Sequence, residues 1–357
     1  MTFEFKQDVW NYLANTDKPV VMYGTGNGAD KLFSAFSHYG IEVKDIFVSD
    51  MFYRGQTFRD YNVIRYSDVI EKYEDCIVVL AFAIFRDDMM SFIKEIARRY
   101  EVLAPEYPVF GDDYFTYESL NLYEKDIEFV RSILADDTSK KVFENLLKYR
   151  VTGKIEYAIA AETDREEVFE NIIRLGSNEA YVDLGAYRGD TIEEFLELTD
   201  YKFDRIYALE PDRKNYKKLC EYIDSLSSDS IDKSRISLVN KASYNCEKVM
   251  SFDGGGGRNS SLDCGGDIAH TVAVDDVLRG ERTSYIKMDV EGAEFETLEG
   301  LKSTLKEYRP ALAISAYHKT ADLFKLPQHI LSLNNEYEIY LRHHPYIPAW
   351  ETNFYCK

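Results

Sequence analysis

Short apolar runs alternate with amphipathic segments through the first third of the chain. The runs VVMY (20–23) and CIVVLAFA (76–83) carry no charge, as expected for strands that are buried on both faces of a sheet. Between them, SDVIEKY (67–73) has helical spacing, and Ser67 is its expected N-cap. Because strands that alternate with helices predict a parallel sheet, we expect a Rossmann-like unit over residues 1–116.

The pattern changes at residue 117 and changes back near residue 177. Over 117–176, apolar residues recur three and four positions apart with charged faces between them, which predicts a helical connector or cap. Over 177–357, strand-like runs again alternate with helix-like segments. The sequence therefore predicts an α/β protein in which a helical connector joins two Rossmann-like, doubly wound parallel-sheet domains.

The charge balance narrows the range of partners. The formal net charge is -20 and the pI is near 4.8, so a nucleic acid is a poor candidate ligand. The longest apolar run, IVVLAFAIF (77–85), is too short for a membrane span, and the N-terminus lacks the pattern of a signal peptide. We therefore expect a cytoplasmic protein. The five cysteines are scattered and show no CxxC spacing, which favours reduced thiols.

The stretch YVDLGAYRGDT (181–191) places an acid ahead of a glycine loop. Asp183, Gly185 and Gly189 form the pattern DxGxxxG, and Glu210 follows Asp183 by 27 residues at the end of the next expected strand. A carboxylate at the first position would repel a pyrophosphate but suits an ammonium group, and Glu210 is placed to bind ribose hydroxyls. S-adenosylmethionine (SAM) fits this charge pattern. In the alternative, Asp183 only caps a turn and Glu210 lies at the surface.

Further SAM contacts are expected around this loop and at the next strand ends. Pro211 continues the turn after Glu210, and the end of the third strand would lie beside the adenine. The residues expected here are Ala186, Tyr187, Asp190, Thr191, Pro211, Lys241 and Ala242.

Several stretches together resemble the FkbM family of SAM-dependent methyltransferases. They are YVDLGAYRGDT, YALEPD, RNSSL, TVAVDDVL and IKMDVEGAEFETLEGL, and the resemblance covers roughly residues 120–357. It implies a class I methyltransferase fold and O-methylation, often of sugars in antibiotics, glycans or cell-surface polysaccharides. It also implies that Ser260 and Ser261 border the cofactor. The motif residues of the family fall on Asp183, Gly185, Gly189, Glu210, Lys287, Asp289, Glu291, Gly292 and Glu294.

The first glycine loop differs from the second. Gly24, Gly26 and Ala29 fit GxGxxA with no acid before them, so backbone N–H groups could face a phosphate, and Asp50 could bind a ribose. This region resembles the small nucleotide-sugar-binding domain found ahead of some sugar acyltransferases. The alternative is an empty structural domain used for docking.

The expected chemistry lies at the end of the strand YIKMD (285–289). We expect Asp289 to border the cofactor and position the acceptor, with Glu291 close to the reaction. His318 follows the next strand and could accept the hydroxyl proton. Alternatively, Lys287 pairs with Glu294, Glu291 caps a helix and His318 is structural.

A metal is not expected from the sequence. His343 and His344 could line the cleft or bind a metal with Asp289, but their spacing matches no recognised ligand set. The run of four glycines at 254–257 would be ordered by a ligand or form a mobile hairpin tip.

The sequence thus favours a SAM-dependent O-methyltransferase that acts on a sugar, glycan or sugar-containing small molecule. The chain lacks the NPPY-type turn of amino-methylating enzymes, so oxygen is the expected acceptor. One alternative is a non-catalytic protein that binds a nucleotide-sugar or docks a partner. Another is an NAD-dependent oxidoreductase that uses the loop at residues 24–29.

Overall fold

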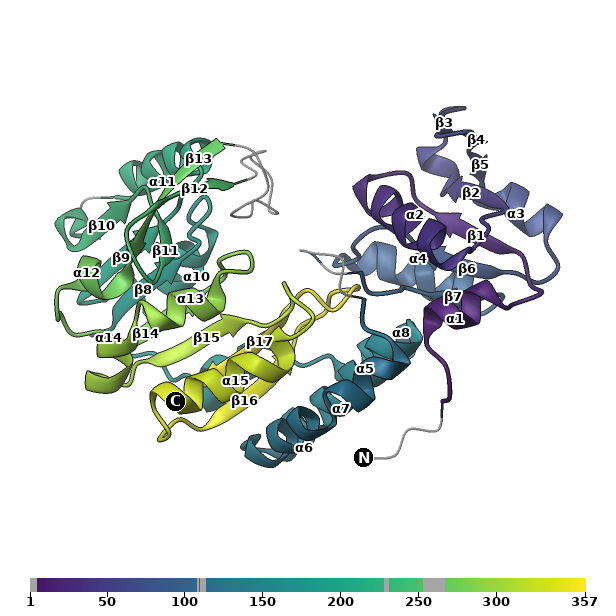
Figure 1. The fold of residues 1–357 in the computed structure, drawn as a ribbon. Coiled ribbons are helices and arrows are strands. Elements are labelled where there is room, and N and C mark those ends of the chain that lie inside the picture. The colour runs from purple at the N-terminus through teal and green to yellow at the C-terminus, as the bar shows by residue number, and fades with distance from the viewer. Residues whose placement is uncertain (1–4, 108, 110–113, 228–230, 253–266) are drawn as a thin grey trace.

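The computed structural model describes residues 5–107, 109, 114–227, 231–252 and 267–357, and within them it contains two main sheets (Figure 1). The N-terminal unit, a five-stranded sheet with its helices, is wholly parallel in the order β5-β2-β1-β6-β7. Its strands are β1 (Val20–Tyr23), β2 (Asp45–Val48), β5 (Ile64–Arg65), β6 (Ile77–Leu80) and β7 (Glu101–Leu103), and a small hairpin pairs β3 (Thr57–Phe58) with β4 (Tyr61–Asn62).

Helices cover both faces of this sheet because β1 and β6 are buried on both sides. Apolar residues of α1 and α2 form one buried cluster with one face, and those of α3 and α4 pack on the other. Helix α3 begins after Arg65, so the prediction that Ser67 is its N-cap is wrong; the Ser67 amide instead donates to Asp50. The helical segments are α1 (Val9–Ala14), α2 (Asn27–Tyr39), α3 (Tyr66–Lys72), α4 (Asp87–Ala97) and the 3-10 turn η1 (Asp50–Phe52).

Helices join the two sheets, as the amphipathic pattern predicted (Figure 1). Helix α7 (Asp137–Thr152) is capped at its start by Asp136, whose side chain accepts from the Ser139 amide, and at its end by Gly153 in a left-handed conformation. The other segments are α5 (Tyr117–Leu122), α6 (Glu124–Ile133), α8 (Ile155–Ala161), α9 (Arg165–Glu167) and the π-helical turn η2 (Val168–Ile172).

The C-terminal unit is built on a seven-stranded sheet in the order β10-β9-β8-β14-β15-β17-β16. Its first five strands are parallel, and β17 runs antiparallel to both of its neighbours. The strand order reverses between β8 and β14, which defines a switch point at the carboxyl ends of these strands. The strands are β8 (Ala180–Leu184), β9 (Arg205–Leu209), β10 (Ile236–Val239), β14 (Tyr285–Met288), β15 (Ala311–Ser315), β16 (Ile339–His343) and β17 (Thr352–Cys356).

Helices also pack on both faces of the second sheet. They are α10 (Asp190–Leu198), α11 (Arg213–Ser225), α12 (Val274–Leu278), α13 (Glu294–Glu299), α14 (Lys302–Glu307) and α15 (Asp322–Leu333), with the 3-10 turn η3 (Lys233–Arg235). A separate three-stranded sheet has the strand order β11-β13-β12. Its strands are β11 (Ala242–Tyr244), β12 (Val249–Phe252) and β13 (Asp267–Ala273).

The fold class is confirmed as α/β with two doubly wound units joined by helices. The boundaries at 116/117 and 176/177 stay predictions. Among the described residues, no helix combines the length and the apolar character that a membrane crossing requires.

Candidate active site

The loop after β8 touches the loop after β14 at the switch point. Gly185 has φ +83°, and a Cβ atom there would lie 1.9 Å from the carbonyl oxygen of Asp289. The Asp289 amide donates to the Leu184 carbonyl at 2.9 Å, which continues the pairing of the two strands. Only glycine fits at position 185, because both its backbone angle and the close approach exclude a side chain.

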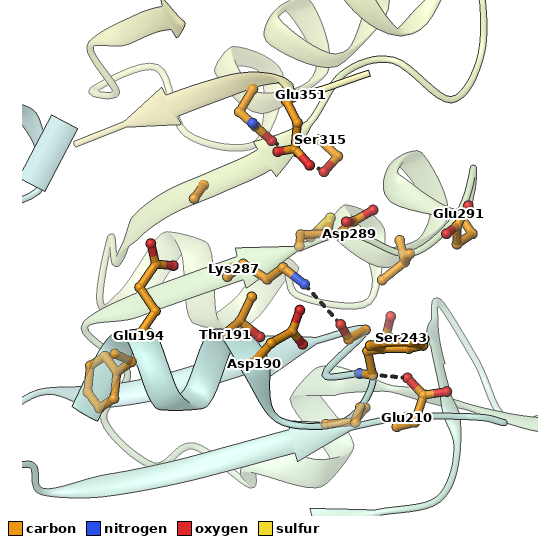
Figure 2. Close-up of a pocket in the computed structure, with 18 of the residues that line it drawn as sticks. Asp190, Thr191, Glu194, Glu210, Ser243, Lys287, Asp289, Glu291, Ser315 and Glu351 are labelled. Atoms are coloured by element: carbon orange, nitrogen blue, oxygen red, sulfur yellow. Dashed lines mark hydrogen bonds between the residues drawn. The ribbon is translucent and has the colours of Figure 1, made fainter. Parts of the chain in front are cut away.

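A cavity of about 510 Å³ opens over these strand ends (Figure 2). Of the SAM contacts expected from the sequence, those that line it are Gly185, Tyr187, Asp190, Thr191, Glu210, Pro211, Ala242 and Asp289. Val109 reaches the cavity from the N-terminal unit.

Asp183 is fully buried and lies behind the cavity wall, where it holds two residues that do line it. Its Oδ2 accepts from the Thr191 hydroxyl at 2.5 Å, and its Oδ1 lies 3.5 Å from the Lys287 ammonium, which donates to the Gly185 carbonyl at 2.9 Å. Burial raises the pKa of Asp183. Burial alone would lower the pKa of Lys287, but nearby carboxylates, chiefly Asp183, raise it on balance. Direct contact between Asp183 and a cofactor stays a prediction.

Glu210 presents a carboxylate at the end of β9, on the cavity wall. The residue is 6% exposed, and its two carboxylate oxygens accept from the backbone amides of Tyr187 and Asp212 at 2.9 Å each. Burial raises its pKa to about 7, against the opposing effect of these two amide donors. The geometry leaves lone pairs on both oxygens for further donors.

Other expected contacts lie elsewhere. Ala186 is buried in the core, and a Cβ atom at Gly189 (φ +97°) would strike Tyr222, so these positions shape the turn into α10. The Lys241 ammonium lies 2.7 Å from Glu247, and Lys241 does not line the cavity. Ser260, Ser261 and the glycines at 254–257 lie outside the described residues.

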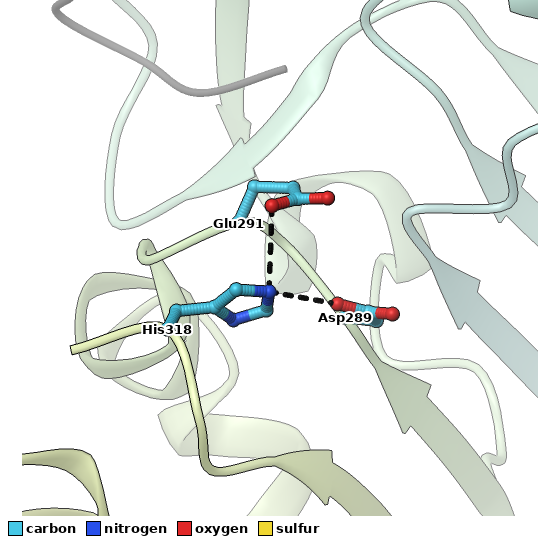
Figure 3. Close-up of side chains that lie close together, drawn as sticks. All are labelled: Asp289, Glu291 and His318. Carbon is cyan, nitrogen blue, oxygen red and sulfur yellow. Dashed lines mark ion pairs between the residues drawn. The ribbon is translucent and has the colours of Figure 1, made fainter. Parts of the chain in front are cut away.

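The three candidate catalytic side chains, Asp289, Glu291 and His318, come together (Figure 3). His318 Nε2 lies 3.3 Å from Asp289 Oδ1 and 3.4 Å from Glu291 Oε2, while Nδ1 lies 2.8 Å from Glu294 Oε1. Asp289 and Glu291 line the cavity, whereas the His318 side chain is fully buried behind them. We call Asp289, Glu291 and His318 the acid–histidine cluster.

The acid–histidine cluster is electrostatically unusual. Burial would lower the pKa of His318, but the carboxylates of Glu294, Glu291 and Asp289 outweigh it and raise the pKa to about 10. Burial, with Asp289 and Glu294 nearby, raises the pKa of Glu291 to about 8. The predicted role of His318 as a base stays a prediction, and a protonated, buried ring weighs against it.

Two of the three alternatives expected for these residues are not found, and a structural role for His318 stays a prediction. Lys287 pairs with Asp183 and not with Glu294. Glu294 instead accepts from the Val290 amide at 3.1 Å, and α13 has Ala293, not Glu291, at its N-cap.

The opposite wall of the cavity is formed by residues that were not anticipated from the sequence. Tyr317 lies just after β15, and its hydroxyl is 3.4 Å from each carboxylate oxygen of Asp289. The remaining wall residues that were not anticipated include Ser243, Ser315, Tyr346, Trp350 and Glu351. Tyr346, Trp350 and Glu351 belong to the β16–β17 connection, whose return to the site follows from the antiparallel pairing of β17.

The remaining candidates lie apart from this cavity. Gly24 (φ +113°), Gly26 and Asp50 are not among its lining residues, and the Asp50 carboxylate accepts from the Ser67 amide. His343 is hydrogen-bonded to Thr352, and His344 to Tyr355. Within the described part of the chain, neither histidine belongs to a group with metal-ligand spacing.

Known proteins resemble this chain in sequence and in fold. Residues 183–347 match the family model of the methyltransferase FkbM domain. No curated protein matches the chain.

Among solved structures, methyltransferase FkbM from Methylobacillus flagellatus KT has a TM-score of 0.77 at 24% identity, covering 98% of this chain and 93% of its own. An rRNA methylase from Streptococcus thermophilus (14% identity, 51% of this chain and 88% of its own) has a TM-score of 0.34. Precorrin-6y C5,15-methyltransferase from Geobacter metallireducens GS-15 (12% identity, 55% of this chain and 88% of its own) also has a TM-score of 0.34. The first match shows that the two chains share a fold over nearly their whole length.

Proposed function

We propose that the protein is a SAM-dependent O-methyltransferase whose acceptor is a sugar, a glycan or a sugar-containing small molecule. The observation that carries the proposal is the charge of the cavity at the switch point. Its wall contains six carboxylates and two cationic side chains: Asp190, Glu194, Glu210, Asp289, Glu291 and Glu351, with Arg165 and Lys287. Both cations are paired with carboxylates.

This charge favours a cationic cofactor over a dinucleotide. SAM has an ammonium group and a sulfonium but no phosphate, so an acidic wall attracts it and repels a pyrophosphate. Glu210 would accept from the ribose hydroxyls, as the acid at the end of the second strand does in dinucleotide-binding folds. Asp190, Thr191 and Tyr187 line the same wall and complete the proposed SAM site.

The acceptor would lie between the sulfonium methyl group and the acid–histidine cluster. In the reaction its hydroxyl oxygen would form a bond to the methyl carbon, the electron pair of the broken carbon–sulfur bond would return to sulfur, and the hydroxyl proton would pass to water in the cavity. Asp289 is proposed to orient the hydroxyl, because it lines the cavity beside the expected cofactor. Tyr317, Tyr346 and Trp350 offer aromatic faces on which a sugar ring could stack.

Calorimetry with the Glu210→Ala variant tests the SAM site. Each hydrogen bond to a charged group contributes on the order of 1.5 to 3 kcal/mol, so loss of Glu210 should weaken SAM binding by at least tenfold. Glu247→Gln is the control, since this exposed carboxylate pairs with Lys241 away from the cavity. Unchanged affinity in Glu210→Ala would refute the assignment.

The acceptor class needs a separate experiment. We expect transfer of labelled methyl from SAM to at least one member of a panel of sugars, nucleotide-sugars and glycans, and product mass identifies the methylated group. If SAM binds but only non-sugar hydroxyl compounds are methylated, the sugar part of the proposal is wrong.

The N-terminal loop is proposed to bind a nucleotide-sugar as substrate or anchor. Gly26 has an ordinary φ and open space around the position of a Cβ atom, so Gly26→Val should not disturb the free protein. UDP-, GDP- or dTDP-sugars should raise the melting temperature of the wild type but not of this variant. No shift at millimolar ligand would favour the docking role.

A further inference from the structure

The acid–histidine cluster has the composition and spacing of a metal site. Asp289 and Glu291 lie on the turn between β14 and α13, and His318 follows β15, the neighbouring strand. One ligand atom from each of the three side chains lies within 4.8 Å of the other two. Figure 3 shows both carboxylates on the same side of the imidazole, facing Nε2.

Glu294 holds the imidazole in the orientation that a metal ligand requires. Its carboxylate, 1% exposed, lies 2.8 Å from Nδ1, on the side of the ring opposite the other two acids. Metal-binding histidines usually donate their second ring N–H to such a carboxylate, which fixes the tautomer and raises the basicity of the metal-binding nitrogen. The Val290 amide in turn donates to Glu294 at 3.1 Å, so this supporting carboxylate is itself held in place.

The cluster is also accessible, and two of its three side chains are carboxyl groups. Asp289 and Glu291 are 31% and 21% exposed and line the cavity, whereas His318 and Glu294 close the site from behind. Lys287, which also lines the cavity, forms an ion pair with Asp183 and donates a hydrogen bond to the Gly185 carbonyl. A divalent cation would offset the repulsion between the converging carboxylates.

We propose that Asp289, Glu291 and His318 bind a divalent transition-metal ion that faces the cavity. One imidazole nitrogen and two carboxylates suit ions such as Mn²⁺ or Zn²⁺, and the cavity side leaves coordination positions for water or substrate. The role of the ion rests on the proposed function: it would bind the acceptor hydroxyl, lower the pKa of that hydroxyl and ease loss of its proton to solvent. The binding itself requires neither SAM nor an acceptor.

The site is tested by titrating the chelator-treated full-length protein with Mn²⁺. Calorimetry and electron paramagnetic resonance both monitor the binding. We expect one saturable site in the wild type. Glu291→Gln and Asp289→Asn should each weaken Mn²⁺ binding at least tenfold, and Glu294→Gln should do so by about 10- to 100-fold through the histidine. Both cavity-facing variants replace partly exposed side chains with near-isosteres, so they should fold.

Glu351→Gln is the matched control, because Glu351 lines the same cavity without belonging to the acid–histidine cluster, and it should leave Mn²⁺ affinity unchanged. SAM affinity is measured in parallel on every variant, which separates failure of the metal site from failure of the SAM site. If neither Mn²⁺ nor Zn²⁺ binds at millimolar concentration, or if the cluster variants bind as tightly as Glu351→Gln, the proposal is overturned.

Discussion

At the scale of single residues, the sequence predicted best where the backbone limits the choice of residue. Gly185 and Glu210, which were predicted as SAM contacts, both line the cavity, because a strand end followed by glycine, and an acid at the next strand end, leave few alternatives. The partner of His318 could not be predicted. Glu294 is three residues beyond Glu291 but points to the ring from the other side, and sequence spacing does not record such directions.

SAM affinity should depend on pH through Glu210. Burial favours the neutral form and raises its pKa to about 7, so the free protein takes up a proton as the pH falls through this value. Asp212 also acts to raise the pKa, while Lys287 and the two amide donors act to lower it. Because the ribose hydroxyls need the ionised form as acceptor, the dissociation constant should rise toward tenfold per unit below pH 7.

Calorimetry at pH 6, 7 and 8 measures this dependence, with Glu210→Gln as the control. The ammonium group of SAM also titrates, but it affects both proteins equally, so the difference between them isolates Glu210. Low pH, which weakens SAM binding, should stabilise the fold through the same residue. Because the pKa of Glu210 is higher in the folded protein than in the unfolded chain, its protonation contributes stability to the fold. This contribution is complete below the unfolded-state pKa near 4.5 and is lost as the pH rises through 7. Equal pH slopes in both proteins would contradict the prediction.

Gly185→Ala should be more damaging than an ordinary substitution of a left-handed glycine. Gly280 has a similar φ of +76° with nothing within 4 Å of a Cβ position, so Gly280→Ala measures the backbone penalty alone, on the order of 1 kcal/mol. At Gly185 the Cβ atom would also collide with the Asp289 carbonyl, 1.9 Å away. Urea unfolding should show the larger loss for Gly185→Ala, together with weaker SAM binding; equal losses would mean that the loops separate easily.

At the scale of secondary-structure elements, apolar runs identified the parallel strands, but boundaries and pairing partners were less secure. The apolar residues of HTVAVDDVL (270–278) are typical of a single strand, yet β13 ends at Ala273 and α12 begins at Val274. The spacing of apolar residues in FETLEGLKSTLKEY (295–308) is typical of a single helix, yet the segment is divided between α13 and α14 around Gly300. A Cβ atom at Gly300 would lie 1.9 Å from the Tyr244 carbonyl, a long-range contact that helical periodicity does not show.

The antiparallel pairing of β17 between β15 and β16 could not be predicted from the pattern of apolar residues. Strands β16 and β17 are separated by a loop that carries Tyr346, Trp350 and Glu351 to the cavity, so missing the pairing meant missing that wall. Alternation of apolar residues indicates a strand but does not say which neighbour it pairs with.

The end of β16 is fastened to the connector through Arg342. Its side chain is 2% exposed and lies 2.7 Å from Asp136, the N-cap of α7, and 2.9 Å from Glu167, with a further bond to the Ser139 hydroxyl. Replacement by methionine keeps much of the apolar stem but removes every one of these bonds. We expect Arg342→Met to lower the free energy of unfolding by about 3 kcal/mol.

Arg309→Met provides the comparison, because its pair with Glu336 is exposed (48% and 71%) and should contribute less than about 1 kcal/mol. Chemical denaturation of the two variants measures the difference. Similar losses in both would mean that the Arg342 network contributes little beyond a surface ion pair.

At the scale of the whole molecule, the buried clusters show how the two units depend on each other. One cluster belongs to the N-terminal unit and one to the C-terminal unit, but the largest contains residues of both sheets and of the connector, including Phe47, Phe143 and Leu312. A buried ion pair reinforces it: Arg150 of α7 contacts Glu106, which follows β7, and donates to the Thr320 carbonyl in the C-terminal unit at 3.1 Å. The sequence suggested a connector with two separate domains and gave no sign of this shared core.

A shared core of this kind predicts one cooperative unfolding transition for the whole chain. The two tryptophans make the test direct, since Trp10 is fully buried in the N-terminal unit while the proposed SAM site lies in the C-terminal unit. Because a ligand stabilises every element that unfolds with its site, saturating SAM should raise the melting temperature seen by tryptophan fluorescence as much as that seen by circular dichroism. At a hundredfold excess over its dissociation constant the gain is about 2.7 kcal/mol, which is large enough to detect. Trp350→Phe leaves Trp10 as the reporter in the N-terminal unit, and its fluorescence transition should still follow the SAM concentration. A Trp10 transition that comes first on heating and does not move with SAM would show that the N-terminal unit unfolds independently.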